Sequence, residues 1–323
     1  MRRPAEIRAP HHAPLLHVLR GGMTESVHYG SVVVLAPDGT TLFQAGDIDG
    51  ACYPRSAAKP LQATAMTRLG LDLPPELLAL AASSHSGEGM HLAGAERILD
   101  SAGLGEADLR NPADLPFDPV ERDAWVSAGR DARRLAHNCS GKHAAMLSVT
   151  RRHGWSTVDY LNAYHPLQQE IARTVEDLAD EPVARVAVDG CGAPLFAVSL
   201  RGLATAIGRI ASAPDGSAEH RVAHAIRRHP ELLGGSRREV TRLIRAVPGL
   251  IAKDGFEAVQ VAALPDGTSV AVKISDGGER ARMPVTAAAL ALAGADPAAL
   301  LPFSGGDDLR VVGDLAVELD RAA

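Results

Sequence analysis

The chain has 323 residues, of which 46% are hydrophobic and 3% aromatic, and its formal net charge is −6. This length is enough for one large domain with a substantial core, and the acidic balance argues against nucleic acid and anionic membranes as partners. No apolar run is as long as a membrane span. Residues 1–15 are interpreted as a frayed lead-in to a strand and not as a signal peptide. We therefore expect a single cytoplasmic domain over residues 1–323.

Two segments predict β-hairpins that share a turn sequence. In residues 27–47, an apolar and β-branched run is followed by the turn Pro-Asp-Gly-Thr and a returning strand. Residues 257–278 repeat this order of strand, Pro-Asp-Gly-Thr turn and strand. We expect both hairpins to lie in one antiparallel sheet, which would bring the two ends of the chain together.

The segment between the hairpins is predicted to be mostly helical, because apolar residues recur there at a spacing of three and four. Gly or Pro residues end most of these stretches, while residues 102–136 contain loops rich in Asp, Pro and Arg. The order of strands, helices and strands predicts an α+β fold with segregated layers. The stretches with helical periodicity are 56–70, 91–103, 140–154, 167–180 and 219–230.

The strongest local motif is Ser56-x-x-Lys59. Pro60 has no N–H and favours the first turn of a helix, which places the helix start near Ser56. Residues three apart share a helix face, so Lys59 is expected to reach the Ser56 hydroxyl and to take its proton. A lysine acts as a base only in its neutral form, which burial or a neighbouring cation favours. The alternative is a chance Ser-x-x-Lys at an ordinary helix start.

Lys253-Asp254-Gly255 directly precedes the second hairpin. Some serine hydrolases carry a Lys-x-Gly element on a strand at the edge of the site, where the lysine supplies positive charge. The glycine is expected to let substrate approach the backbone, and Lys253 to favour neutral Lys59 by repulsion. A surface turn is the alternative for this common tripeptide.

A cluster of small polar residues follows an apolar run at Ser84-His85-Ser86-Gly87-Glu88. A hydroxyl, an imidazole and a carboxylate within five residues suit substrate binding and proton transfer. Ser84 is the candidate for a second catalytic hydroxyl, and His85 and Glu88 are candidate substrate-binding residues. A helix N-cap followed by a polar loop explains the pattern equally well.

The cysteines form a third group of candidates. Their number in this chain is three, an odd and low count that argues against a disulfide framework. Cys139 follows Asn138 and precedes Lys142 by three residues, and Cys191 follows Asp189 in a Gly-flanked turn. Two thiolates and a third donor form a possible Zn²⁺ site. Spacing alone favours a histidine, at position 137 or 143, as the third ligand, and two buried free thiols remain the alternative.

In their order along the chain, these motifs resemble the L-asparaginase family typified by the inducible, thermolabile enzyme of Rhizobium. The resemblance runs through most of the chain and rests on the segments LRGGMTESVHYGSVVV, YPRSAAKP, SSHSGE, HNCSGKHAAML, VDGCGAP and AKDGFEAV. It implies a fold like that of serine β-lactamases and bacterial glutaminases, with a sheet from both chain ends packed against a mostly helical middle. It also implies L-asparagine as substrate and a homodimer.

The resemblance further implies two serine–lysine pairs, Ser56 with Lys59 and Ser84 near Lys253. It implies a zinc ion, not required for the chemistry, that would be bound by the three residues Cys139, Lys142 and Cys191. The remaining substrate-binding candidates are Asn138, Asp189 and Gly255.

The expected reaction is deamidation of L-asparagine, in which Ser56, deprotonated by neutral Lys59, attacks the side-chain amide and Ser84 and Lys253 relay protons. The sequence leaves open whether the two serines exchange roles and whether asparagine or glutamine is preferred. Two alternatives remain: a glutaminase or another serine acyl hydrolase of the same shape, and a non-catalytic protein that senses zinc or thiols.

Overall fold

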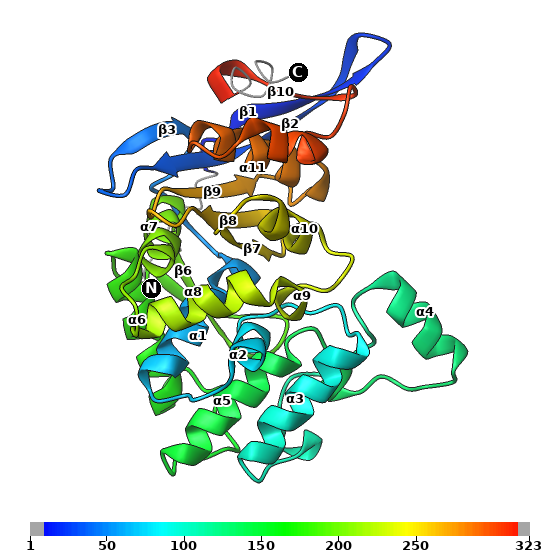
Figure 1. Ribbon diagram of the computed structural model, residues 1–323, viewed down its shortest axis with the longest axis vertical. Coiled ribbons are helices and arrows are strands. Elements are labelled where there is room, and N and C mark those ends of the chain that lie inside the picture. The colour runs from blue at the N-terminus through cyan, green and yellow to red at the C-terminus, as the bar shows by residue number, and fades with distance from the viewer. Residues whose placement is uncertain (1–9, 316–323) are drawn as a thin grey trace, which may run out of the picture.

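The structure is a computed structural model and describes residues 10–315. Its strands and helices lie in two parts, a sheet layer at one end and a helical part at the other (Figure 1). The strands are β1 (Ala13–Arg20), β2 (Met23–Leu35), β3 (Thr41–Ala45), β4 (Ala51–Cys52), β5 (Arg185–Val188), β6 (Pro194–Ser199), β7 (Ile251–Gly255), β8 (Val259–Ala263), β9 (Ser269–Ile274) and β10 (Leu309–Val311).

The helical elements come mostly from the middle of the chain. They are the 3₁₀ turn η1 (Arg55–Ala58) and the helices α1 (Lys59–Arg68), α2 (Pro75–Ala81), α3 (Gly89–Ser101), α4 (Pro119–Ser127), α5 (Ser140–Arg152), α6 (Pro166–Ala179), α7 (Leu200–Ala211), α8 (Ala218–Arg228), α9 (Pro230–Leu233), α10 (Glu239–Ala246), α11 (Glu279–Leu292) and α12 (Pro297–Leu300). All five helices expected from the periodicity are present. Within residues 10–315, no helix is long and apolar enough to cross a membrane.

Both chain ends supply the main sheet, which confirms the α+β prediction. The seven strands are antiparallel and run in the order β10-β1-β2-β9-β8-β7, with β3 also paired to β2. The two predicted hairpins are β2–β3 and β8–β9, and β2 joins them by pairing with β9. Strand β1 begins at Ala13, so the last residues of the expected lead-in are strand, while residues 1–9 lie outside the described residues.

The sheet is covered on both faces, by α7 and by α11 (Figure 1). For this reason the second half of β2 is buried at every position, Gly30 to Leu35, instead of at alternate ones. In the helical part, α1 is buried on all sides except at its last residue, as is typical of a helix in the centre of a core. The 3₁₀ turn η1, which leads into this central helix, packs against the edge strand β7, and so η1 and the end of β7 together position the candidate site.

Candidate active site

The Ser56 segment forms the predicted helix start in two steps. Residues Arg55–Ala58 make the 3₁₀ turn η1, and α1 follows from Lys59 with Pro60 in its first turn, where a missing N–H costs no helical hydrogen bond. Arg55 has a φ of 51°, the left-handed region that residues with side chains rarely adopt. Strained backbone of this kind gathers at functional sites, and here it lies directly before Ser56.

Gly255 explains how strand β7 approaches this turn. A Cβ added at Gly255 would lie 2.6 Å from the Pro54 carbonyl oxygen and 2.9 Å from the Ala57 nitrogen. Only glycine permits such close backbone packing. The glycine of the Lys-x-Gly element therefore lets η1 pack against the strand; Gly255 also lines the cavity described below, and its role in substrate binding stays a prediction.

Lys59 is bound to Ser84 and not, as expected, to Ser56. Its side chain is 1% exposed, and its Nζ lies 2.8 Å from Ser84 Oγ, 2.6 Å from the Ser83 carbonyl oxygen and 3.0 Å from Cys139 Sγ. Besides its bond to carbon, a lysine nitrogen can form three hydrogen bonds, and these three partners account for all of them. The long side chain thus turns away from its own helix start toward the loops at 83–84 and 139.

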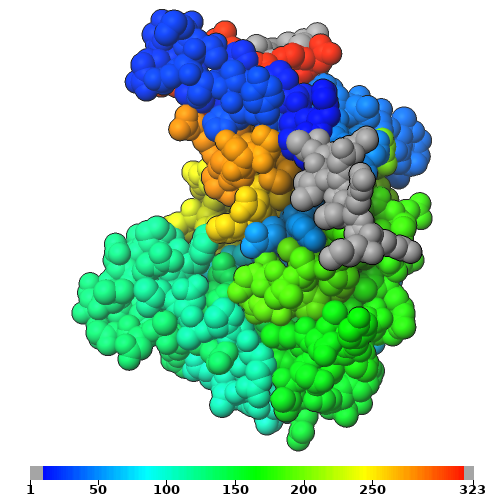
Figure 2. Space-filling model, turned by 180° about the vertical axis from the view of Figure 1, so that it is seen from behind, coloured from blue at the N-terminus to red at the C-terminus, as the bar shows by residue number. Residues whose placement is uncertain are grey.

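Both serines nevertheless face one cavity, whose volume is about 270 Å³. It lies where the segment around α4 meets the strands and α11, and the surface is hollowed between these parts in Figure 2. Among the described residues, no hydrogen bond joins the side chains of Ser56 and Lys59; the two are linked only through the backbone, where the Lys59 N–H donates to the Ser56 carbonyl oxygen. The cavity is lined by Ser56, Ser84, Phe117, Asn138, Arg238, Asp254, Gly255, Phe256, Glu279 and Arg282.

Lys253 lies behind this cavity, fully buried on β7. Its Nζ donates to the Asp254 carbonyl oxygen at 2.7 Å and to Asp254 Oδ1 at 2.6 Å. Burial, together with the charge of Lys59, lowers the pKa of Lys253 to about 8, although Asp254 opposes the shift. Its hydrogen bonds thus go to Asp254, whereas the expected neighbour Ser84 is bound to Lys59.

His85 and Glu88, two expected substrate-binding residues, lie outside the cavity lining. His85 is fully buried, its Nε2 lies 2.8 Å from Ser140 Oγ, and its ring stacks on that of His91. Burial lowers the pKa of His85 well below its usual range, so that it is a neutral core residue. Glu88 caps α3 and accepts hydrogen bonds from the backbone and hydroxyl of Ser236. These contacts are those of a buried polar residue and of an N-cap, and substrate binding by either residue stays a prediction.

Asn138 and Asp189 have different positions relative to the cavity. Asn138 lines it, and its Oδ1 accepts from Cys139 Sγ at 3.1 Å. Asp189 is not in the lining and accepts from Arg55 Nε at 2.7 Å. Through this ion pair, the turn that carries Cys191 is tied to the strained residue before Ser56.

The expected metal ligands Cys139, Lys142 and Cys191 come together in the interior. Lys142 Nζ lies 3.1 Å from Cys191 Sγ, and a hydrogen bond between the two thiols raises the pKa of Cys139 and lowers that of Cys191. Burial lowers the pKa of Lys142, but the charges of the two sulfurs outweigh it and hold the pKa above its ordinary value. The His137 ring instead accepts from the Cys139 N–H at 3.0 Å.

No group of three or more His, Cys, Asp and Glu side chains within residues 10–315 is arranged to hold a metal. A metal at the thiols would therefore need Lys142 as its third donor.

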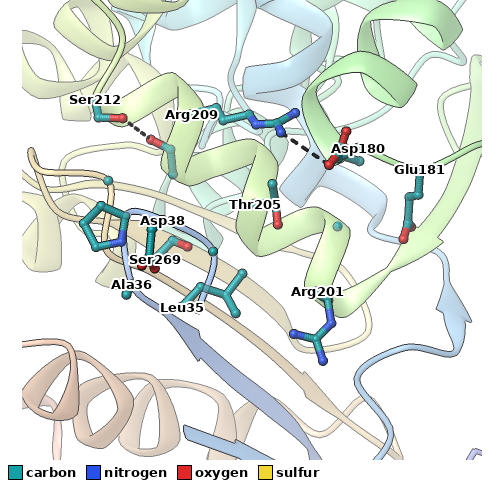
Figure 3. A pocket seen from close by; sticks show the side chains of 16 residues that line it. Leu35, Ala36, Asp38, Asp180, Glu181, Arg201, Thr205, Arg209, Ser212 and Ser269 are labelled. Carbon is teal, nitrogen blue, oxygen red and sulfur yellow. Dashed lines mark hydrogen bonds and ion pairs between the residues drawn. The ribbon is translucent and has the colours of Figure 1, made fainter. Parts of the chain in front are cut away.

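A second cavity, of about 340 Å³, lies between α7 and the β2–β3 turn (Figure 3). Both arginines in its lining are already in ion pairs: Arg209 lies 3.5 Å from Asp180, and Arg201 lies 2.7 Å from Asp49. None of the catalytic candidates lines it. The serine-lined cavity is therefore the better candidate for an active site.

Comparison with known protein families decides the assignment, because residues 16–304 match the family described as L-asparaginase II. The chain belongs to the L-asparaginase II family. No curated protein matches the chain.

Solved structures with similarity to this L-asparaginase II member include the following three. Native Mglu is 16% identical with a TM-score of 0.34, and the match covers 82% of this chain and 62% of Mglu. A β-lactamase from Mycobacterium bovis is 15% identical with a TM-score of 0.43 over 77% of this chain and 88% of its own. EstCE1, described as a hydrolase with promiscuous acyltransferase activity, is 14% identical with a TM-score of 0.41 over 86% of this chain and 93% of its own. The chain thus spans about six-tenths of the length of Mglu.

Several cavity residues of this L-asparaginase II chain carry no motif and were missed from the sequence. Arg238 and Phe117 line the cavity, with the guanidinium 4.7 Å from the ring centroid. Phe256 lines it as well, with Arg55 5.3 Å from its ring. Phe256 follows Lys-x-Gly directly, so its position was available, whereas nothing local to Arg238 distinguishes it from the many other arginines.

Proposed function

We propose that the chain hydrolyses the side-chain amide of L-asparagine, with Ser84 as nucleophile and Lys59 as its base. The observation that carries the proposal is the 2.8 Å hydrogen bond between Lys59 Nζ and Ser84 Oγ beside a cavity that Ser84 lines. A buried amine in contact with an accessible hydroxyl is the geometry that nucleophilic catalysis requires. The family assignment supports an amide substrate. The roles of the two serines are thus exchanged relative to the sequence-based expectation.

The partners of Lys59 suit a neutral amine. Neutral lysine keeps two N–H bonds and one lone pair. In that form the amine would donate to the Ser83 carbonyl and to Cys139 Sγ, and its lone pair would accept the Ser84 O–H across the 2.8 Å contact between Nζ and Oγ. The same contact that positions Ser84 therefore removes its proton.

The steps follow from this contact. Ser84 Oγ attacks the amide carbon as its proton passes to Lys59. Lys59 returns the proton to the departing nitrogen, so that ammonia leaves and an aspartyl ester remains on Ser84. Water then attacks the ester with Lys59 again as base, which releases L-aspartate and restores the hydroxyl.

Ser56 and the η1 turn are proposed to stabilise the oxyanion. Ser56 lines the cavity within the first turn of a 3₁₀ helix, where backbone N–H groups have no acceptor inside the helix. Donors at a helix start favour negative charge that develops during reaction.

A zinc ion at Cys139, Lys142 and Cys191 is proposed as well. The donor set fits, because two adjacent thiols and an amine are buried within hydrogen-bonding distance of one another. A bound zinc ion would supply Lewis acidity and positive charge beside Asn138. Metal analysis of the purified protein and of Cys191→Ser tests this, with zinc in the first and none in the second as the expected result.

Ammonia release from L-asparagine and L-glutamine, measured side by side, tests the function. Ser84→Ala is expected to lower kcat roughly 10⁴-fold or more, and Ser56→Ala roughly 10²-fold as an oxyanion donor. A diazoketone analogue of asparagine should label Ser84, as peptide mass mapping would report. Label on Ser56, or near-normal turnover by Ser84→Ala, would sink the assignment of the nucleophile, while faster release from glutamine would favour the glutaminase alternative. Sedimentation velocity of the same protein tests the expected homodimer.

A further inference from the structure

Arg238 presents an unused donor at the proposed active site. It is the N-cap residue of α10 and lines the serine cavity. One end of its guanidinium forms an ion pair with Asp254 through Nη2, and its face lies over the ring of Phe117. Its Nη1 is buried and has no hydrogen-bond partner among the described residues. A buried donor without a partner costs free energy, so Nη1 favours a ligand that accepts a hydrogen bond.

The other cations near the cavity are already committed to protein partners. Arg282 donates to Glu279, Gln260 and Glu239. Arg55 donates to Asp189, and Lys253 donates to Asp254. Among the described cations near this cavity, Arg238 is thus the one whose charged head group retains a free, buried donor.

The local charge balance points to an anion. Lys253, Asp254 and Arg238 form a chain of contacts with one negative and two positive groups. Arg282 contacts two carboxylates of its own, whereas Lys253 and Arg238 share the one carboxylate of Asp254, so that Arg238 has no counter-charge to itself. A ligand carboxylate beside Arg238 would neutralise it, and Phe117 would shield the pair from water, which strengthens a charge-assisted hydrogen bond.

We propose that Arg238 Nη1 binds the α-carboxylate of the substrate and thereby restricts the enzyme to side-chain amides of α-amino acids. This inference rests on the proposed function, because it assigns one group of the proposed substrate to one donor. Phe117 and Asp254 are positioning residues that hold the guanidinium plane. Arg238 thus determines substrate specificity and takes no part in proton transfer.

Two amides that differ in one group test the inference. L-Asparagine and 3-aminopropanamide share the reacting amide and the amine, but the second lacks the α-carboxylate. The wild-type protein is expected to prefer L-asparagine by roughly 100-fold or more in kcat/KM. Arg238→Gln should lose roughly 100-fold on L-asparagine and remain within a few-fold on 3-aminopropanamide, which also shows that the variant folds.

The matched control is Arg242→Gln, since Arg242 lies on the same helix and contacts Phe303 instead of the cavity. It should keep the wild-type preference for L-asparagine. Arg238→Lys should recover only part of the preference, because an ammonium cannot contact Asp254 and a ligand in one plane.

Equal losses on both amides in Arg238→Gln would overturn the inference. Calorimetric binding of L-aspartate and β-alanine separates this failure from failure of the proposed function. If wild-type protein releases no ammonia from either amide, the proposed function fails. L-Aspartate bound at least 100-fold more tightly than β-alanine, with the difference lost in Arg238→Gln, would still support the carboxylate site, and equal binding of the two would reject it.

Discussion

The surroundings of Lys59 and Lys253 differ in a way that separates a base from a fixed charge. Both lysines are almost fully buried, and each lies one hydrogen bond behind a residue that lines the cavity. Lys59 contacts a hydroxyl, a carbonyl and a thiol, whereas Lys253 contacts a carboxylate. A neutral hydroxyl can exchange a proton with an amine, while the Asp254 carboxylate favours the ammonium form of Lys253 against the burial that lowers its pKa to about 8. The same residue type is thus suited to two different tasks by its partners alone.

The composition supports this distinction. The chain is rich in arginine, and lysine occurs at positions 59, 142, 253 and 273. The first three are buried together around the cavity and the thiols. Arginine cannot lose its proton in proteins, but lysine can. The three lysines are therefore basic side chains at this site that can exist in a neutral form, which arginine cannot.

The largest expected effect on activity comes from replacing Lys59, the proposed base. Lys59→Met preserves most of the side-chain volume but removes the base, so kcat for ammonia release from L-asparagine should fall roughly 10³- to 10⁴-fold. The matched control is Lys273→Met on β9, outside the cavity lining. Steady-state assays of both variants provide the measurement. A Lys59→Met protein that retains more than a tenth of wild-type kcat would reject the base assignment.

A smaller effect is expected at Lys253, and it depends on pH. The folded-state pKa of about 8 lies below the ordinary 10.5, so the unfolded chain binds more protons between these values. The free energy of unfolding should therefore gain up to about 3 kcal/mol from this residue as pH rises from 8 to 10.5. Lys253→Met should lack that gain.

Denaturant titrations at pH 7.5, 9 and 10.5 measure the difference between the two proteins, in which the titration of other groups cancels. In the same variant, kcat/KM should fall about 10-fold, because Asp254 loses one of its two cations. A difference in stability that is constant over this pH range would contradict the lowered pKa.

Much of the fold was accessible from the sequence. Apolar and β-branched runs around two identical turns predicted β2–β3 and β8–β9, and regular periodicity predicted five helices of the middle. The helices that cover the sheet, α7 and α11, were harder to predict from the sequence. Helix α11 contains Pro284, and α7 contains two glycines, of which Gly208 packs against the Gly267 carbonyl. Proline and glycine lower helix propensity, and here close packing on the sheet overrides it.

The candidate site was accessible as a set of residues but not as a set of contacts. Spacing of three placed Lys59 beside Ser56, and the real partner, Ser84, comes from a loop 25 positions away in the chain. A lysine side chain spans several ångströms, so its end is fixed by tertiary packing and not by helical phase. The same limit applies to Arg238, because its proposed role depends on contacts with Asp254 and Phe117, which lie far from it in the sequence.

The smallest expected effect concerns the strained turn before Ser56. Arg55 holds a left-handed backbone and an ion pair with Asp189. Arg55→Ala and Arg55→Gly both remove the ion pair, which should raise KM for L-asparagine about 3- to 10-fold as the Cys191 turn is released from the cavity wall. Glycine adopts the left-handed region without steric cost, whereas alanine does not. Arg55→Gly should therefore be more stable than Arg55→Ala by about 1 kcal/mol in thermal or denaturant unfolding.

Equal stability of these two variants would show that the backbone at position 55 carries no strain. A more stable glycine variant with a raised KM would instead show that the strained backbone is the cost of placing the Arg55 side chain for its ion pair with Asp189. The chain would then accept an unfavourable backbone angle next to Ser56 because the side chain at that position couples the catalytic turn to the turn that bears the thiol. This coupling connects the serine cavity to the proposed zinc ligands through Asp189, and the arginine variants should consequently also weaken any dependence of KM on added zinc.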